Sequence, residues 1–308
     1  MKYVVTGGAG FIGSHIVEGL ADLRHEVVIL DNFFSGKMEN IQPFLKNRNV
    51  TLVRGSVTEL PLLKKTFEGA DGIFHEGAIA SVPRSIASPI ATNEVNISGT
   101  LNVLIAARDC GIRKVLLASS SSVYGNAAAL PKREEMSPDP LSPYAVSKLT
   151  GEYYLKVFSG IYGFETLALR YFNVFGPRQD PQSEYAAVIP KFITKILRHE
   201  SPTIHGDGRQ TRDFTYVKDV VQANIRAMES HAQGVYNVAY CKRIDLNELA
   251  SLIMEITGIF VPAVYEPARA GDVRDSLADI RLAQEAFGYE PEYTVRSGLE
   301  ETIAWYQK

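Results

Sequence analysis

A tyrosine and a lysine in the segment SPYAVSK have the spacing of a proton-transferring pair. Tyr144 and Lys148 stand four positions apart, so on a helix their side chains would share one face. A free tyrosine has a pKa of about 10, and a base working near neutral pH needs that pKa lowered by roughly three units. A lysine ammonium one turn away supplies a field of the required sign. Such pairs are common on helix surfaces, so this interpretation depends on the other motifs of the chain.

Four consecutive serines, Ser119 to Ser122, follow the apolar run 115–118, which has the character of a buried strand. Serine runs usually belong to flexible linkers. Here Val123 and Tyr124 follow instead of further glycine and serine, so a linker does not fit. The hydroxyl groups at this strand end therefore need a chemical explanation.

The segment TGGAGFIG places Gly7, Gly10 and Gly13 between a predicted strand and a predicted helix. Glycine permits positive φ, lets backbone N–H groups approach a pyrophosphate, and lets the helix pack close to the strand. The helix N-terminus adds a partial positive charge. Three glycines alone are also compatible with a tight structural turn. The order strand, glycine loop, helix at the N-terminus favours a dinucleotide-binding loop.

Asp31 ends the second predicted strand, 18 residues after Gly13. A carboxylate at this place accepts hydrogen bonds from a ribose diol and repels a 2′-phosphate. Arg24 and Lys37 lie nearby, but neither replaces the acid. The sequence therefore predicts NAD rather than NADP; without the glycines, Asp31 would fit a turn former equally well.

Apolar runs alternate with helical patterns through the first part of the chain, which predicts an α/β fold. We expect a Rossmann-type doubly wound parallel sheet with helices on both faces, and a smaller α/β substrate-binding lobe. The strands are expected at 3–5, 26–30, 50–53, 72–75, 114–118 and 166–169, and the helices at 12–23, 90–109 and 144–162. After Phe172 prolines interrupt the pattern, and a helix at 219–229 and a strand at 235–238 are expected to return to the sheet.

The composition excludes several classes of protein. Hydrophobic residues make up 45% of the 308 residues and charged residues 22%, which is ordinary for a globular chain. A net charge of −3 and a pI near 6.1 argue against nucleic acid or an anionic membrane as partner. Cys110 and Cys241 are too few for a disulfide framework, and the histidines have no metal-ligand spacing. Without a membrane span or a signal peptide, we expect a soluble cytoplasmic protein.

Six segments together resemble the extended short-chain dehydrogenases/reductases, and within that group the nucleotide-sugar epimerases. They cover nearly the whole chain and are TGGAGFIG, SSSSVYG, YAVSK, LRYFNVFGPR, GDGRQTRDFTYVKD and RAGDVRDSLAD. The resemblance is strongest to the bacterial UDP-N-acetylglucosamine 4-epimerases. It implies reversible hydride transfer at the sugar C4 through a 4-keto intermediate, with tightly bound NAD and a UDP-hexose substrate.

The same resemblance implies two domains and a homodimer. Residues 1–172 and 214–241 would form the NAD-binding domain, and residues 173–213 and 242–308 the UDP-sugar-binding lobe. The helices near 90–109 and 144–162 would pair with those of a second copy in a four-helix bundle.

The resemblance also explains the serines. The family places a hydroxyl residue four positions before the tyrosine of its VYG motif, which here is Ser120. It would bond the sugar 4-hydroxyl and the catalytic tyrosine, so the catalytic residues are Ser120, Tyr144 and Lys148. Relatives that dehydrate or decarboxylate the sugar carry acidic residues immediately after this hydroxyl. Ser121 and Ser122 occupy those positions here, which disfavours both reactions.

The remaining site residues follow from matching family positions. The implied cofactor-binding residues are Gly7, Gly10, Phe11, Ile12, Gly13, Asp31, Asn32, Ser35, Gly36, Ser56, Val57, Asn96, Ser119, Tyr144, Lys148 and Tyr171. The implied substrate-binding residues are Ser81, Ser120, Ser122, Tyr144, Asn173, Val188, Arg212, Arg269, Asp272 and Ser276. Arginine forks suit phosphate oxygens, although Arg212 could instead pair with the adjacent Asp213. Ser276 would face the C2 substituent, where a small residue leaves room for an N-acetyl group.

Two positions depart from the family pattern, and the substrate stays open. Ser56 stands where relatives have an aspartate against adenine, and Glu76 stands where an apolar or amide residue is usual. UDP-glucose/UDP-galactose and UDP-glucuronate 4-epimerases are alternatives, as is a non-catalytic NAD-binding regulator on the same fold. The intact Ser120, Tyr144 and Lys148 argue against the regulator.

Overall fold

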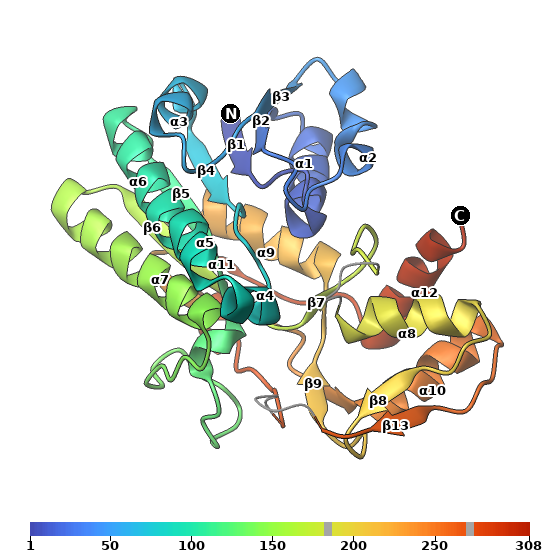
Figure 1. Ribbon diagram of the computed structural model, residues 1–308. Coiled ribbons are helices and arrows are strands. Elements are labelled where there is room, and N and C mark those ends of the chain that lie inside the picture. The colour runs from blue at the N-terminus through green and yellow to red at the C-terminus, as the bar shows by residue number, and fades with distance from the viewer. Residues whose placement is uncertain (182–186, 269–273) are drawn as a thin grey trace.

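The computed structural model describes residues 1–181, 187–268 and 274–308, which form a layered α/β body beside a smaller lobe (Figure 1). Within these residues a seven-stranded sheet has the order β11-β6-β5-β4-β1-β2-β3, and every neighbouring pair is parallel. Its strands are β1 (Lys2–Thr6), β2 (Glu26–Asp31), β3 (Val50–Arg54), β4 (Gly72–His75), β5 (Lys114–Ser120), β6 (Glu165–Tyr171) and β11 (Gly234–Val238). The strand order reverses between β1 and β4, which is where such sheets bind ligands. The predicted doubly wound fold is confirmed.

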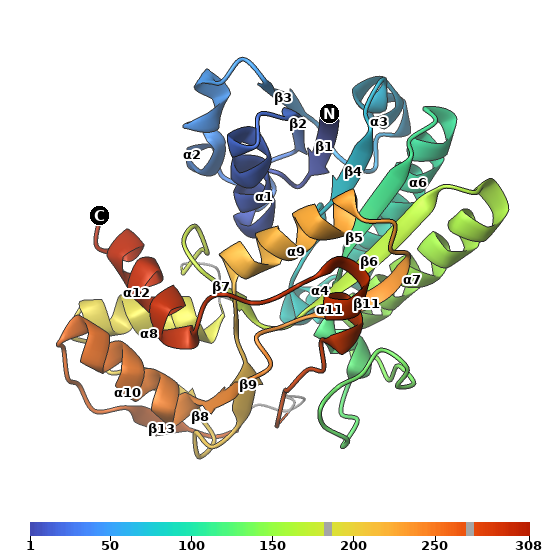
Figure 2. The ribbon, with the colours of Figure 1, turned by 180° about the vertical axis from the view of Figure 1, so that it is seen from behind.

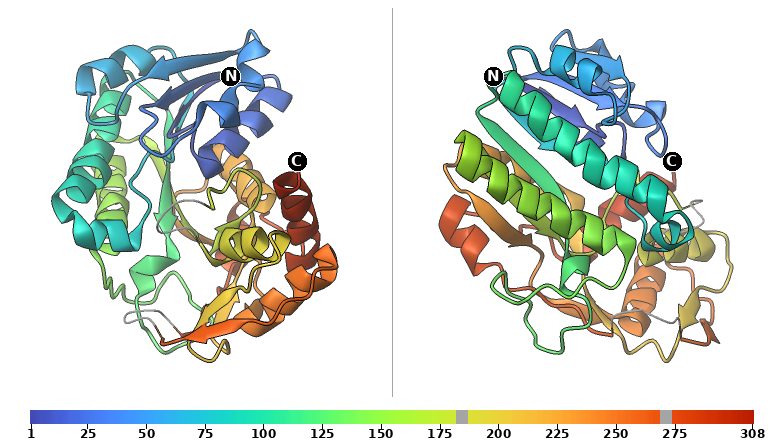
Figure 3. Two further views of the ribbon diagram at one scale, coloured as in Figure 1. Left: turned by 45° about the vertical axis from the view of Figure 1, so that its right-hand side comes forward. Right: turned by 60° about the vertical axis from the view of Figure 1, so that its left-hand side comes forward.

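Strand side chains alternate between two hydrophobic cores, one on each face of the sheet. Val5 and Ile29 belong to one core, whereas the adjacent Val4 and Val28 belong to the other. The first face is covered by α1 (Phe11–Asp22), α9 (Val217–Glu229) and α11 (Arg281–Phe287), as seen from behind in Figure 2. The other face is covered by α3 (Leu60–Phe67), α6 (Gly99–Asp109) and α7 (Pro143–Tyr162), and α6 and α7 lie side by side in Figure 3. Because both faces are buried, the strands need the continuous apolar runs seen in the sequence.

Helix α7, which carries the predicted catalytic pair, has well-defined ends. The Ser142 side chain accepts a hydrogen bond from Ala145 N, and Pro143 occupies the first turn. Gly163 ends the helix with a φ of 75°, a conformation that favours glycine. These signals fix the turn of the helix that presents Tyr144 and Lys148.

The helix expected over 90–109 is interrupted. It consists of α5 (Pro89–Asn93), a π-helical segment (Glu94–Ser98) and α6. The wider turn directs the buried Asn96 amide to Ile79 N at 2.8 Å, Ile79 O at 3.2 Å and Ser147 Oγ at 3.0 Å. The prediction missed this interruption because a π turn has no local sequence signal and is stabilised by these long-range bonds.

The smaller lobe combines short strand pairs with three helices around its own core. Its helices are α8 (Val188–Leu197), α10 (Leu246–Thr257) and α12 (Val295–Tyr306). Its strand pairs are β7 (Val174–Phe175) with β10 (Thr215–Tyr216), β8 (Thr203–His205) with β13 (Val264–Glu266), and β9 (Thr211–Asp213) with β12 (Arg243–Asp245). Phe175, Phe192 and Ile253 are among the buried residues that join them. The predicted domain boundaries stay a prediction; α11, within the segment 242–308, packs against β11 and α9 of the main sheet.

Short elements lie at the edges of these layers. They are α2 (Met38–Ile41) after β2, α4 (Val82–Ala87) before α5, and single 3₁₀ turns at Phe44–Lys46 and Ser121–Tyr124. Among the described segments, no helix has both the length and the apolar character needed to cross a bilayer.

Candidate active site

The glycine loop between β1 and α1 forms a tight backbone cradle. Gly7 has a φ of 67°, and Gly10 N donates to Gly7 O at 3.0 Å. A Cβ built on Gly13 would lie 2.3 Å from that same carbonyl oxygen, so only glycine permits this approach of helix to strand. The cradle therefore fits a dinucleotide diphosphate at the N-terminus of α1.

Asp31 closes the cradle from the end of β2. Its carboxylate is buried and accepts hydrogen bonds from Ala9 N at 2.9 Å and Phe33 N at 2.7 Å. Burial raises the pKa of Asp31, and the two N–H donors oppose that rise. Gly36 packs so closely that a Cβ there would lie 2.8 Å from Asp31 Oδ1. A cavity of about 200 Å³ opens beside the carboxylate and is also lined by the predicted residues Asn32, Ser35, Ser56 and Val57.

A larger cavity continues from the glycine loop to the carboxyl edge of β5 and β6. Its volume is about 470 Å³. The predicted residues that line it are Gly7, Gly10, Phe11, Ile12, Gly13, Asp31, Ser35, Ser119, Tyr144, Lys148 and Tyr171. The fold thus brings the glycine loop and the Tyr–Lys pair to one continuous space, as a bound dinucleotide requires.

Lys148 is buried and held by the sheet. Its Nζ donates to Ala118 O at 2.7 Å and lies 5.8 Å from the ring centroid of Tyr144. Burial lowers the pKa of Lys148 to about 8, although the charge of Glu76 acts in the opposite direction. The ammonium is thereby fixed next to the tyrosine ring.

The pKa of Tyr144 moves against the direction expected of a base. Burial raises it to about 12; the hydrogen bond with Ser120 lowers it and the charge of Glu76 raises it further. Lys148 by itself therefore does not bring the pKa of Tyr144 toward neutrality, because burial dominates. A further positive charge is needed beside the ring.

The serines at the end of β5 point in different directions. Ser119 Oγ donates to Glu152 Oε1 at 2.5 Å, whereas Ser120 Oγ accepts from Ser122 N at 3.1 Å. Ser122 Oγ is buried and has no hydrogen-bond partner among the described residues. A buried hydroxyl without a partner is uncommon in proteins and is compatible with a ligand contact.

Glu76, the unusual residue after β4, lies at the wall of the same cavity. Its Oε1 accepts a hydrogen bond from the Tyr171 hydroxyl at 2.9 Å. Burial raises the pKa of Glu76 to about 7, while the Tyr171 hydroxyl and the Lys148 charge lower it. The neighbouring His75 is a core residue, with Nδ1 2.7 Å from Thr6 Oγ1 and Nε2 3.0 Å from Thr100 Oγ1.

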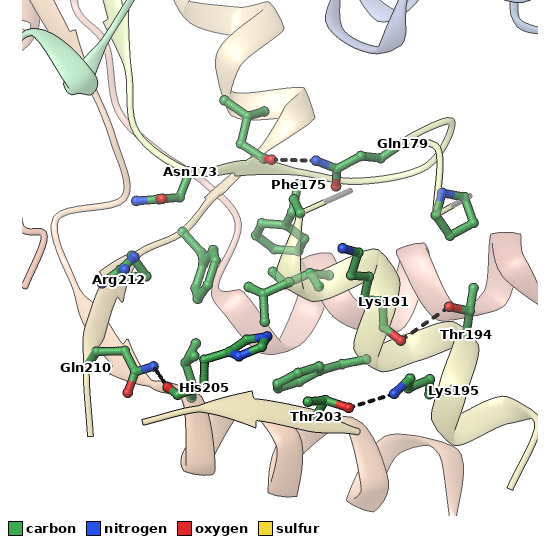
Figure 4. A pocket seen from close by; sticks show the side chains of 18 of the residues that line it. Asn173, Phe175, Gln179, Lys191, Thr194, Lys195, Thr203, His205, Gln210 and Arg212 are labelled. Atoms are coloured by element: carbon green, nitrogen blue, oxygen red, sulfur yellow. Dashed lines mark hydrogen bonds between the residues drawn. The ribbon is translucent and has the colours of Figure 1, made fainter. Parts of the chain in front are cut away.

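A second large cavity, of about 680 Å³, lies between α8 and the short strands of the lobe (Figure 4). Figure 4 shows Asn173 and Arg212 on one side of it and Lys191 and Lys195 on the other. Val188 also lines this cavity. The space is polar on both sides and is compatible with an anionic ligand.

Asn173 connects this cavity with the predicted sugar site. Its Nδ2 donates to Asp213 O at 3.1 Å and to Ser276 Oγ at 3.4 Å. Arg212 Nη1 donates to the carbonyls of Thr211 and Arg274, each at 2.9 Å. Asp213 instead accepts from Tyr240 N and Ala278 N.

Some predicted residues lie elsewhere. Ser81 caps α4 by accepting from Arg84 N at 3.2 Å, and Asn96 holds the loop at Ile79. Arg269 and Asp272 lie outside the described residues. The binding roles of all these residues stay predictions.

The structure adds residues that the sequence analysis passed over. Phe34, Arg84, Gln179 and Asp180 line the cofactor cavity, and Lys191, Lys195, His205 and Gln210 line the lobe cavity. The spacing of Lys191 and Lys195, four apart on one helix, was a usable signal. Arg84 lies on the short helix α4, and the others stand on loops and short strands with no such pattern. Across the described segments, no cluster of three or more His, Cys, Asp or Glu side chains could hold a metal ion.

A glycine cradle at the edge of a parallel sheet, with a Tyr–Lys pair on a helix that packs against the sheet, defines an NAD-dependent enzyme of the short-chain dehydrogenase/reductase type. More narrowly, the chain belongs to the NAD dependent epimerase/dehydratase family, which it matches over residues 3–239. It is 36% identical over 310 residues to the UDP-glucose 4-epimerase of Mycolicibacterium smegmatis, covering 100% of this chain and 99% of that protein.

Two solved structures of nucleotide-sugar epimerases are also similar to this chain along nearly its whole length. The UDP-N-acetylglucosamine 4-epimerase from Methanobrevibacter ruminantium M1, in complex with UDP-N-acetylmuramic acid, aligns with a TM-score of 0.96 at 45% identity, covering 99% of this chain and 98% of that chain. The UDP-glucuronic acid 4-epimerase from Bacillus cereus, in complex with UDP-glucuronic acid and NAD, aligns with a TM-score of 0.93 at 30% identity. The alignment covers 100% of this chain and 99% of that chain. The protein is thus an NAD-dependent enzyme of the isomerase class, and the regulator alternative is excluded.

Proposed function

We propose that the protein is a UDP-N-acetylglucosamine/UDP-N-acetylgalactosamine 4-epimerase. The observation that carries this proposal is Ser276, a small residue that is 9% exposed and lies 3.4 Å from Asn173 Nδ2. A small side chain beside the sugar leaves the volume that an N-acetyl group needs, whereas a bulky ring would fill it. The relative at 45% identity, itself a UDP-N-acetylglucosamine 4-epimerase, supports this substrate.

UDP-glucose and UDP-glucuronate are the second candidates. Epimerases named for each of them are 36% and 30% identical to this chain. A serine at position 276 admits an N-acetyl group but does not require one, so UDP-glucose would also fit. The substrate panel below separates these candidates.

Three side chains would carry the proton chemistry. Tyr144 takes the proton of the sugar 4-hydroxyl, and Ser120 bonds that hydroxyl and the tyrosine. Lys148, fixed by Ala118 O at 2.7 Å, holds the nicotinamide ribose. When bound, NAD would accept the hydride from the sugar C4, and its positive ring would supply a charge beside Tyr144. After the 4-keto sugar turns over in the cavity, Tyr144 returns the proton as C4 is reduced on its other face.

Different residues would bind the adenosine part of NAD and the UDP part of the substrate. Asp31 is proposed to bind the adenosine ribose of NAD, and Asn173 and Arg212 the UDP diphosphate. Arg212 suits phosphate because its planar fork presents paired donors. Arg269 and Asp272, matched by the resemblance alone, are proposed to bind the second phosphate and the uridine ribose.

The test is incubation with UDP-N-acetylglucosamine, UDP-glucose and UDP-glucuronate in separate reactions, with the 4-epimers resolved by NMR. We expect the N-acetyl sugar to be converted with the highest kcat/KM. Tyr144→Phe is the control, because it keeps the ring and removes the proton acceptor, so conversion should be lost in every reaction. Preferred conversion of UDP-glucose or UDP-glucuronate would reject the N-acetyl assignment.

We also propose that the protein is a homodimer that pairs through α7 and the helical segment near 90–109, which ends in α6. Val146, Tyr153, Val157 and Ile161 recur on the outer face of α7 and are between 45% and 67% exposed. Figure 3 shows α6 and α7 side by side on the outside of the sheet, where two copies would form a four-helix bundle. A contiguous apolar face of this kind is typical of an interface between subunits.

A further inference from the structure

Glu76 is an ionisable residue in the cofactor cavity, and the proposed reaction does not use its side chain. It follows β4 at the carboxyl edge of the sheet and lines the cavity that also contains Tyr144 and Lys148. A carboxylate is costly to place in such a site unless something compensates its charge. Its partners therefore indicate its role.

The hydrogen-bond network fixes the position of the carboxyl group. Asn224 Nδ2 donates to Val220 O at 2.8 Å and to the Tyr171 hydroxyl at 2.9 Å. The Tyr171 hydroxyl lies 3.0 Å from Asn224 Oδ1 and 2.9 Å from Glu76 Oε1, and with the amide nitrogen as donor to the hydroxyl its proton points at Glu76. Tyr171 and Asn224 are both buried, so the chain of donors ends on the carboxylate and holds it at the cavity wall.

Lys148 is the cation whose charge acts on the pKa of Glu76, yet its ammonium is hydrogen-bonded elsewhere. The two charges influence each other's pKa, but the Lys148 ammonium donates to Ala118 O at 2.7 Å, on β5. No ion pair within 4.0 Å joins Glu76 to Lys148 or to any other cation in the described chain. Glu76 thus lines the cavity, and no cation of the described residues lies within ion-pairing distance of its carboxylate.

We propose that Glu76 is the counter-charge of the nicotinamide ring and biases the bound cofactor toward its oxidised form. In the half-reaction, a hydride leaves C4 of the sugar with its electron pair and the 4-hydroxyl proton passes to Tyr144. The sugar is oxidised to the 4-ketone, and the nicotinamide ring is reduced and loses its positive charge. A fixed negative charge stabilises the cationic ring and does nothing for the neutral one. An epimerase benefits because each cycle must end with oxidised cofactor.

This inference concerns the cofactor and holds for any of the candidate sugars. The purified protein is equilibrated with mixtures of NAD and NADH at known ratios until the bound ratio is constant. The protein is then separated and denatured, and the released cofactors are quantified by chromatography. The bound ratio divided by the free ratio gives the relative affinity without any sugar or turnover.

Three variants make the test specific for charge. Glu76→Gln keeps the shape and hydrogen-bond length but removes the charge; it should shift the relative affinity toward NADH by about tenfold, equivalent to about 30 mV for a two-electron couple. Glu76→Asp keeps the charge and should stay near the parent value. Glu134→Gln removes a partly buried carboxylate that accepts from Asn237 N at 2.7 Å, outside the cavity, and should leave the ratio unchanged.

The outcomes separate the two proposals. A parent-like NAD/NADH ratio in Glu76→Gln would overturn the inference, as would equal shifts in the Gln and Asp variants. Loss of epimerisation in Glu76→Gln with an unchanged ratio would also overturn it, because that pattern belongs to a proton-transferring role. Failure of the substrate panel, by contrast, leaves this ratio unaffected.

Discussion

Replacing Glu152 by glutamine should destabilise the protein strongly, because it leaves a buried guanidinium without its counter-charge. Arg170 donates through Nε at 2.9 Å and Nη2 at 2.7 Å to the two carboxylate oxygens of Glu152. The two side chains are only 4% and 3% exposed. Ser119 Oγ adds a third bond, at 2.5 Å to Oε1. Glutamine keeps the shape of the side chain but removes the charge and one acceptor.

The size of the loss follows from burial. Removing one partner of a buried ion pair costs about 3–5 kcal/mol. Arg170 Nη1 is already buried without a hydrogen-bond partner among the described residues, and the Tyr124 ring, 4.6 Å from the guanidinium, carries no formal negative charge to replace that of Glu152. Since glutamine retains one carbonyl oxygen, we expect a cost at the lower end of this range. The free energy of unfolding should fall by about 3 kcal/mol. At about 2–4 °C per kcal/mol for a chain of this size, Tm falls by about 6–12 °C.

The assay is urea and thermal unfolding followed by circular dichroism, with an exposed pair of the same chemistry as control. Arg296 and Glu255 lie 2.9 Å apart, but their side chains are 47% and 63% exposed. Glu255→Gln should cost less than about 1 kcal/mol, because solvent screens such pairs. An equal loss of unfolding free energy in Glu152→Gln and Glu255→Gln would refute the reasoning. Burial would then not determine how much stability is lost when the charge is removed.

Three further predictions concern the sites and the interface. Asp31→Ala should narrow the preference for NAD over NADP, measured by titrating both cofactors, because the carboxylate repels a 2′-phosphate; equal affinities in the parent protein would reject the role of Asp31. Ser276→Tyr should abolish turnover of UDP-N-acetylglucosamine and spare UDP-glucose, because the ring fills the space for the N-acetyl group; an unchanged rate with the N-acetyl sugar would remove Ser276 from that position. Val157→Asp, on a side chain that is 50% exposed, should convert a dimer to a monomer in light scattering, since an interface would bury the new charge. The same mass in both proteins would contradict a dimer through this face.

The large sheet was predictable because its strands are buried on both faces. Residues 72–75 were expected as a strand and form β4 without a change of bounds, and β1 differs from its predicted range 3–5 by one residue at each end. Continuous apolar runs separated by amphipathic helices have few other solutions. The glycine loop was equally clear, since close helix–strand packing at Gly13 tolerates no side chain.

The lobe was predictable only as an irregular region, because its strands are two or three residues long and depend on distant partners. Thr203 pairs with Val264, and Thr211 with Asp245. Neither segment is long enough to establish an alternating pattern, so the pairing follows from the packing of α8 and α10. Arg212 and Asp213 illustrate the same limit. Neighbouring strand residues point to opposite faces, so adjacency in sequence did not produce the ion pair that it suggested.

The chemistry of the cofactor cavity depends on burial, which residue types do not reveal. Tyr144 rises to a pKa of about 12, Glu76 rises to about 7 and Lys148 falls to about 8, each toward its uncharged form. These shifts share one cause, the loss of water around all three groups. A positive ring in that cavity would lower the pKa of both Tyr144 and Glu76, and so would favour the charged carboxylate and a more basic tyrosine. The Tyr–Lys motif therefore points to the proposed base, and the charge that would make it one would come from the cofactor proposed to bind at the glycine loop.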